Sequence, residues 1–101
     1  LFIDDCVDGI ITLTNSAYNK PLNLGSEEEI NILNFYDLVA KIAKKEINLE
    51  FNMDAPTGPL GRSCDLTKTK KILHWEPKYS LLEGMKKTYS WIDAKVHRKN
   101  Y

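Results

Sequence analysis

The sequence predicts an α/β fold with a few short strands and about four helices. Three short apolar segments, at residues 1–3, 21–25 and 49–53, alternate along the 101-residue chain with stretches whose apolar residues recur at helical spacing. This alternation is typical of α/β proteins, in which helices pack against a mostly parallel sheet. Because three short strands do not complete a sheet, we expect at least one strand edge to lack a neighbour.

The first helix is predicted to follow the strand end at residues 1–3 and to stop before Asn15. Its apolar residues, such as Val7 and Ile11, recur at the spacing of one helical face. Asp4 and Asp5 stand at its start, where carboxylates accept hydrogen bonds from free backbone N–H groups. We therefore interpret the two aspartates as helix caps, and not as a pair of catalytic carboxylates.

The second unit is a strand and a helix. Pro21 opens the short apolar segment 21–25, at a position where its missing N–H does least harm to a strand. Asn31 is the predicted N-cap of the helix that follows. The apolar stripe of this amphipathic helix consists of Phe35, Leu38, Val39 and Ile42.

A third strand is predicted at residues 49–53, where apolar and polar residues alternate. Residues 54–61 hold two prolines and two glycines and form a long loop, a kind of segment that often carries function. A short helix, capped by Asp65 or Thr67, is then predicted to run to Leu73. It ends there because the residue before Pro77 avoids helical geometry.

The last helix is predicted to start at a capping box, with Ser80 at the N-cap and Glu83 three residues later. Its spacing predicts a buried face, and the aromatic residues around it are interpreted as core and boundary residues. The residues expected to be buried on this helix are Leu82, Met85, Tyr89, Ile92 and Val96.

Composition excludes several classes of partner. The 14 basic and 14 acidic residues balance, which gives no electrostatic reason to expect binding to nucleic acid or to an anionic membrane surface. No apolar run is long enough for a transmembrane helix. Cys6 and Cys64 form neither a CxxC motif nor a disulfide framework, so we expect free thiols and a cytoplasmic protein. The chain starts without Met and in mid-pattern, which we interpret as a sign of a fragment.

The chain has no residue set that predicts catalysis, a bound cofactor or a metal site. It lacks the glycine-rich motif that cradles a dinucleotide pyrophosphate, and it has no Tyr-x-x-x-Lys motif. His74 and His97 are isolated histidines, without other ligands at metal-binding spacing.

Arg62 is the one candidate binding residue. It follows the loop of residues 54–61, and Arg98 is the only other arginine of the chain. A planar guanidinium can hold a phosphate through two parallel hydrogen bonds, which a lysine cannot do. The alternative is an exposed arginine that pairs with Asp65, and the residues alone leave both interpretations open.

Several motifs in register resemble the extended short-chain dehydrogenases/reductases, in particular their NAD-dependent nucleotide-sugar epimerases and dehydratases. Within that family the sequence is most similar to GDP-mannose 3,5-epimerases, although GDP-fucose synthases, UDP-glucuronate decarboxylases and dTDP-glucose dehydratases share most of the motifs. The matching segments are residues 2–9 (FIDDCVDG), 21–26 (PLNLGS), 31–43, 61–68 (GRSCDLTK), 73–77 (LHWEP), 80–84 (SLLEG) and 88–92 (TYSWI).

The resemblance implies that residues 1–101 form a single C-terminal fragment of a Rossmann-type enzyme. This fragment would comprise the substrate-binding lobe and the last strand and helix of the Rossmann sheet. The N-terminal domain, which binds NAD or NADP and carries the catalytic residues, would be absent. Arg62 aligns with the arginine that contacts the substrate diphosphate in this family. His74 replaces the usual glycine before the tryptophan, which leaves the geometry of that turn open.

The chain alone is therefore expected to bind a nucleotide-sugar without catalysing a reaction. The longer parent is expected to be a homodimer, and the isolated chain to self-associate through apolar surface that the absent domain would cover. Two alternatives are a free-standing protein-interaction module and a non-enzymatic nucleotide-binding domain that relies on Arg62. A single arginine without neighbouring donors would bind weakly, which counts against the latter.

Overall fold

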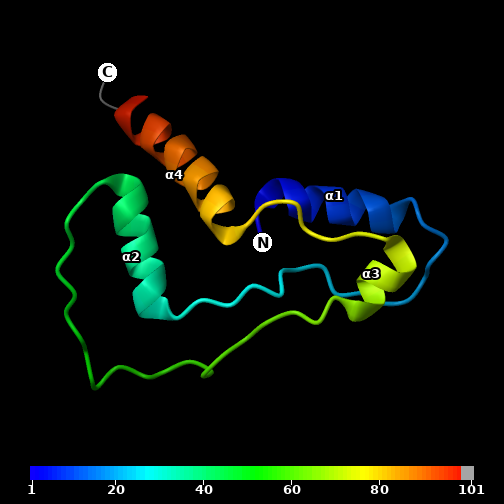
Figure 1. Cartoon of the computed structure of the whole chain (residues 1–101), viewed down its shortest axis with the longest axis horizontal. Coiled ribbons are helices and arrows are strands. Elements are labelled where there is room, and N and C mark those ends of the chain that lie inside the picture. Colours follow the sequence, from blue (N-terminus) through cyan, green and yellow to red (C-terminus); the bar gives the residue numbers. More distant parts are fainter. Residues whose placement is uncertain (99–101) are drawn as a thin grey trace.

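The computed structural model describes residues 1–98. The described chain consists of four helices joined by extended segments (Figure 1). The helices are α1 (Ile3–Thr14), α2 (Ile32–Ala43), α3 (Thr67–Leu73) and α4 (Leu81–Arg98).

The predicted α/β class is wrong, because none of residues 1–98 forms a β-strand. Residues 21–25 and 49–53 are not helical, as their periodicity predicts, but no second strand lies beside either of them. A strand is stabilised by ladder hydrogen bonds to a neighbour, and an alternating or apolar pattern cannot supply that neighbour. Of residues 1–3, only the first two lead into α1, and Ile3 is already its first helical residue.

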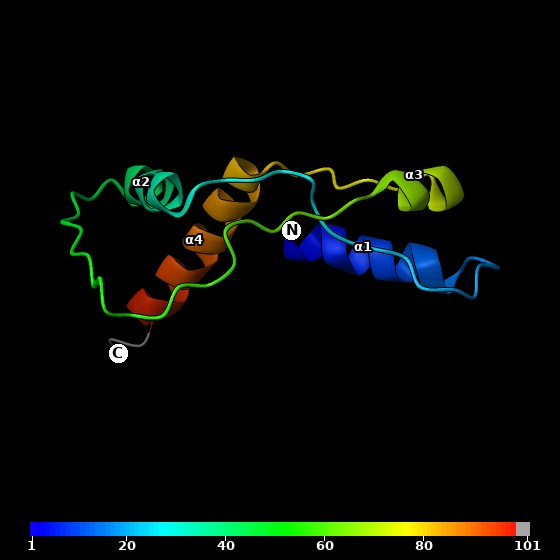
Figure 2. The ribbon, with the colours of Figure 1, turned by 90° about the horizontal axis from the view of Figure 1, so that it is seen from below.

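The described chain is flat and open. Its radius of gyration is 17.2 Å and its extents are 49 × 40 × 20 Å, whereas a compact domain of this length has a radius of gyration of about 13 Å. α2 packs against α4 at one end, and α3 lies beside the far end of α1 (Figures 1 and 2). The segment between α2 and α3 runs around the outside of this frame (Figure 1).

Little of the apolar surface is buried. Among the described residues, Leu66 and Trp75 are the only buried hydrophobic side chains, and Asp5 and Thr69 are buried with them. The predicted buried face of α4 is mostly wrong: Met85 and Tyr89 are half-buried, but the other predicted residues are exposed. The exposed ones are Leu82, Ile92 and Val96. The helical period correctly located an apolar face, but no element within residues 1–98 covers most of it.

The helix caps follow the sequence at two of the four helix starts. The Asn31 side chain accepts a hydrogen bond from the Leu33 N–H at 2.8 Å, as expected of an N-cap. Ser80 and Glu83 form the predicted capping box, in which the Ser80 N–H donates to Glu83 Oε2 at 2.9 Å and the Glu83 N–H donates to Ser80 Oγ at 3.3 Å.

The predicted caps of the other two helices need correction. Phe2 occupies the N-cap of α1 and provides no side-chain cap, while Asp5 binds another segment of the chain. Leu66 occupies the N-cap of α3, although Asp65 does accept a hydrogen bond from the Thr67 N–H at 2.9 Å. Asp5 and Asp65 do lie at the starts of α1 and α3, as predicted. The Asp5 carboxylate, however, binds the distant backbone of residues 78–79, a role that its position in the sequence does not reveal.

His74, which replaces the family's usual glycine, ends α3 in a left-handed conformation with φ 50° and ψ 35°. This conformation is strained for a residue with a Cβ and favourable for glycine. We expect His74→Gly to raise the free energy of unfolding by about 1 kcal/mol. Thermal unfolding followed by circular dichroism measures this, with His97→Gly within α4 as a control that should destabilise. An unchanged or lower melting temperature for His74→Gly would contradict the expectation.

Candidate functional site

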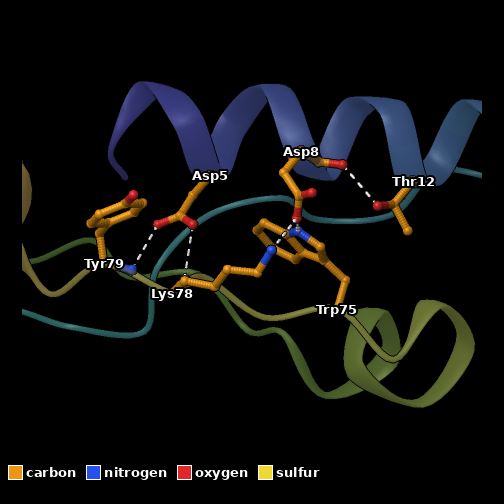
Figure 3. A network of polar contacts seen from close by, with 6 residues as sticks. All are labelled: Asp5, Asp8, Thr12, Trp75, Lys78 and Tyr79. Carbon is orange, nitrogen blue, oxygen red and sulfur yellow. Dashed lines mark hydrogen bonds and ion pairs between the residues drawn. The ribbon is translucent and has the colours of Figure 1, made fainter.

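A buried carboxylate joins α1 to the segment that leads into α4. Asp5 is only 1% exposed, and its carboxylate accepts hydrogen bonds from the N–H groups of Lys78 (2.9 Å) and Tyr79 (3.0 Å). Figure 3 shows the Asp5 side chain directed from α1 toward these two backbone groups. The Phe2 and Tyr79 rings meet edge to face at the same junction, with their centroids 4.9 Å apart. This junction fixes where α4 begins relative to α1.

Asp8 makes a second connection one helical turn further along α1. Its Oδ2 accepts a hydrogen bond from the Trp75 indole at 3.0 Å and lies 3.5 Å from the Lys78 ammonium (Figure 3). The Trp75 ring packs against Gly9, where an added Cβ would lie 3.0 Å from the ring. Gly9 thus allows the indole to approach α1 closely enough for this hydrogen bond.

Residues 23–28 cross from α3 toward α4 and are held at both ends. At the α3 end, the Thr69 hydroxyl donates to the Asn23 carbonyl at 2.6 Å, and the Asn23 amide donates to the Asp65 carbonyl at 3.1 Å. A Cβ on Gly25 would lie 2.7 Å from the Cys64 sulfur, so this position requires a glycine for close approach. These contacts fix the chain just after Arg62 against residues 23–25.

Glu27 and Glu28 continue this connection. Glu27 accepts from the Leu66 N–H at 3.2 Å and pairs with the Lys70 ammonium at 2.6 Å. Glu28 accepts from the Leu81 N–H at 2.8 Å, at the start of α4. Both carboxylates are therefore occupied by contacts within the chain, and they place residues 29–31 at the start of α2.

Arg62 lines an open cavity of about 440 Å³ near the start of α2. The cavity is also lined by residues 28–31 and by Leu60 and Gly61. Arg62 is exposed, and no ion pair between it and Asp65 is found among residues 1–98. The cavity therefore combines an accessible guanidinium with the N-terminus of α2, and both favour an anion. Glu28 and Glu29 also line the cavity and bring opposing charge, because the hydrogen bond that Glu28 accepts from the Leu81 N–H does not neutralise its carboxylate.

Four ionisable groups in and around residues 23–28 have displaced pKa values. The ammonium of Lys70, followed by the Leu66 N–H, lowers the pKa of Glu27 below its ordinary value of 4.5, and Glu27 in turn raises the pKa of Lys70 above 10.5. Hydrogen bonds from Thr67 lower the pKa of Asp65 below 3.8. Hydrogen bonds from Ser80 lower the pKa of Glu83 below 4.5.

These shifts predict how stability depends on pH. A carboxyl group with a lowered pKa stabilises the folded chain at pH values above its pKa in the unfolded chain, and this stabilisation is lost as the pH falls through its folded-state pKa. A lysine with a raised pKa stabilises the folded chain at pH values below 10.5, and this stabilisation is lost as the pH rises through its folded-state pKa. We therefore expect the urea concentration at the unfolding midpoint to decrease when the pH is lowered below about 4.5 and when it is raised above about 10.5. Lys70→Met should reduce the loss of stability at both low and high pH, whereas Lys71→Met, on the same helix, should leave both losses unchanged. Equal profiles for Lys70→Met and the unaltered chain would contradict this.

Sequence reasoning singled out Arg62 as a candidate, but it did not identify the side chains that hold the segments of the chain together. Asp5 and Glu28 lie within acidic groups whose partners are far away in the sequence, and no local pattern reveals such partners. Within the described part of the chain, no three His, Cys, Asp or Glu side chains form a group that could hold a metal ion. None of the helices within residues 1–98 is long and apolar enough to cross a membrane.

Comparison with known proteins relates the chain to enzymes of nucleotide-sugar metabolism. GDP-mannose 3,5-epimerase of Arabidopsis thaliana is 33% identical over 98 residues, which are 97% of this chain and 26% of the relative. UDP-glucuronic acid decarboxylase 1 of Danio rerio is 34% identical over 100 residues, or 98% of this chain and 24% of the relative. The chain is a homologue of part of the extended short-chain dehydrogenase/reductase enzymes that modify nucleotide-sugars. It spans about a quarter of the length of these enzymes.

A solved structure supports this family assignment. UDP-glucuronic acid 4-epimerase from Bacillus cereus, in complex with UDP-glucuronic acid and NAD, matches with a TM-score of 0.80 and 27% sequence identity. The match covers 92% of this chain and 31% of the epimerase chain. No protein-family model matches the sequence. The open arrangement of α1–α4 is thus similar to part of a nucleotide-sugar epimerase about three times as long.

Proposed function

We propose that this chain is the C-terminal, substrate-binding portion of an NAD(P)-dependent nucleotide-sugar epimerase or decarboxylase, and that Arg62 binds the substrate diphosphate. The observation that carries the proposal is the match over almost the whole chain to enzymes of this group, together with the position of Arg62 in an open cavity. A free-standing interaction module would give no reason for that match.

The cavity beside Arg62 supports a diphosphate as the bound group. Two phosphates carry negative charge that one guanidinium can meet with parallel hydrogen bonds, and the N-terminus of α2 adds favourable backbone dipoles. Leu60 and Ile30 also line the cavity and provide apolar surface for the remainder of the ligand. Since Glu28 and Glu29 both oppose an anion, the guanidinium is the group on which binding depends.

The residues of this chain do not fit a dinucleotide cofactor, because the glycine-rich turn that approaches a pyrophosphate is missing from the sequence. We assign NAD or NADP to a part of the longer protein outside this chain and derive no catalytic step here. The chain's own contribution is to bind and orient the substrate and to offset its phosphate charge through Arg62.

The test is calorimetric titration of the chain with GDP-mannose. We expect Arg62→Ala to weaken binding by at least about tenfold, because a charge-assisted hydrogen bond contributes about 1.5–3 kcal/mol. Arg62→Lys should recover part of the affinity, since it keeps the charge but loses the parallel hydrogen bonds. Arg98→Ala removes the same charge from α4 and serves as the matched control, with unchanged affinity.

Equal affinities of the Arg62→Ala and Arg98→Ala variants would contradict the assignment of Arg62. UDP-glucuronic acid, titrated in parallel, separates the two groups of relatives, and we propose GDP-mannose as the better ligand. The same proposal places the longer enzyme in the cytoplasm, in keeping with the two free cysteines, and makes it a homodimer.

A further inference from the structure

The Glu28 carboxylate has two competing partners. Glu28 lines the cavity that contains Arg62, and its Oε2 accepts a hydrogen bond from the Leu81 N–H at 2.8 Å. Leu81 is the first residue of α4 and lies 53 residues further along the chain. A carboxylate is attracted both by the positive N-terminus of a helix and by a guanidinium. The start of α4 and Arg62 therefore compete for Glu28.

The start of α4 holds the carboxylate in this structure. Within the capping box, Ser80 and Glu83 satisfy each other's backbone N–H groups and leave the Leu81 N–H to Glu28. No ion pair between Arg62 and a carboxylate is found among residues 1–98, and the Arg62 side chain is exposed. The guanidinium is thus accessible although a carboxylate of the same cavity lies at its wall.

We propose that the Leu81 N–H keeps the Arg62 cavity open by holding Glu28 away from the guanidinium, so that Glu28 is a positioning residue for Arg62. When this N–H is removed, the Glu28 carboxylate pairs with Arg62 through parallel hydrogen bonds. That pair occupies the donors that a diphosphate uses, and the ligand must displace Glu28 before it binds. The effect on the ligand rests on the function proposed above, whereas the pairing of Glu28 with Arg62 does not.

Proline at position 81 removes the donor and is compatible with the helix. Leu81 is the first helical residue, where the N–H has no partner within the helix and the fixed φ of proline suits the backbone. The N-cap residue Ser80 precedes it, and an N-cap has the extended backbone that the residue before a proline prefers. Leu81→Ala is the matched control, because it removes the same side chain and keeps the N–H.

Exchange of the Arg62 Nε–H proton with water, measured by NMR without any ligand, tests the pairing directly. A hydrogen-bonded ion pair protects this proton, so its exchange should be about twofold to fivefold slower in Leu81→Pro than in Leu81→Ala, the range expected for an exposed ion pair. Adding Glu28→Gln to Leu81→Pro should restore fast exchange, because the amide lacks the charge. Adding Glu29→Gln, which removes the other charge of the cavity, should leave exchange slow.

Calorimetric titration with GDP-mannose measures the consequence for the ligand. Leu81→Pro should bind about twofold to fivefold more weakly than Leu81→Ala, and this difference should vanish in the Glu28→Gln background, a coupling that independent sites would not show. If Arg62→Ala binds as tightly as the unaltered chain, the proposed ligand role of Arg62 fails, and the exchange measurement still decides whether Glu28 is held away from it.

Two results would overturn the proposal. One is equal Arg62 exchange in Leu81→Pro and Leu81→Ala, and the other is slow exchange in Leu81→Pro that persists with Glu28→Gln. Circular dichroism shows whether each variant keeps its helices. If Leu81→Pro does not fold, Glu28→Gln alone decides: unchanged Arg62 exchange is expected, and faster exchange would show that Glu28 is already paired with Arg62 in the unaltered chain.

Discussion

Replacement of Asp5 by alanine is expected to lower the free energy of unfolding by about 3 kcal/mol, because the carboxylate accepts two hydrogen bonds that each contribute about 1.5–3 kcal/mol. The side chain is 1% exposed, and its two partners are the backbone N–H groups of Lys78 and Tyr79. Removal of the carboxylate leaves both donors without a partner in a buried place. A loss of this size is a large share of the stability of a small domain.

Urea unfolding followed by circular dichroism measures this loss. Asp5→Asn keeps one acceptor oxygen without the charge and should fall between the alanine variant and the unaltered chain. Asp37→Ala is the matched control, since Asp37 is an exposed aspartate in the interior of α2. If Asp5→Ala and Asp37→Ala unfold at the same urea concentration, the Asp5 junction does not hold α1 and α4 together.

Trp75→Ala is expected to be the most destabilising single truncation, with a loss of about 3–5 kcal/mol. Trp75 is one of two buried hydrophobic side chains among residues 1–98, and its ring fills the space beside Gly9 and Leu24. The indole N–H also donates to Asp8 at 3.0 Å. Truncation therefore removes apolar contact, opens a cavity and leaves the Asp8 carboxylate without one of its donors.

Trp75→Phe separates these contributions. It keeps most of the apolar contact and loses the hydrogen bond to Asp8, so we expect a loss of about 1–3 kcal/mol. Trp91→Ala is the control, because the other tryptophan is 63% exposed. Similar unfolding midpoints for Trp75→Ala and Trp91→Ala would show that Trp75 is not the centre of the core.

The helices were predictable from the sequence because their signals are local. Asn31, Ser80 and Glu83 cap helices through contacts within three residues, so spacing alone identified the starts of α2 and α4. The end of α3 at Leu73 was also predicted correctly, from Pro77. His74 showed its unusual backbone only in the structure, where it adopts the left-handed conformation expected of the glycine that it replaces.

The predicted strands and most of the predicted buried face of α4 are absent, because both depend on distant neighbours that the sequence pattern does not show. Residues 21–25 and 49–53 carry strand patterns, but a strand also needs a partner in hydrogen-bond register, and none of residues 1–98 provides one. Ile92 and Val96 repeat at helical spacing, yet they are exposed because no described element packs on them. A periodic pattern identifies which face is apolar but does not identify what covers it.

The candidate site shows the same division between local and distant information. Arg62 was noticed for its residue type and its loop, both of which are visible in the sequence. Its surroundings are set by hydrogen bonds over 39 to 53 residues of separation, from Leu66 to Glu27 and from Leu81 to Glu28. Nothing in the local sequence indicates that Glu28 spans from the cavity to the start of α4.

The most direct test of the proposed binding role is to map GDP-mannose on the isotope-labelled chain by two-dimensional NMR. The account predicts that amide shifts cluster at residues 28–31 and 60–62, which line the Arg62 cavity, and disappear in Arg62→Ala. Residues of α1, which do not line this cavity, should not respond to the ligand. Shifts centred on α1, or shifts at residues 28–31 and 60–62 that persist without Arg62, would contradict the account.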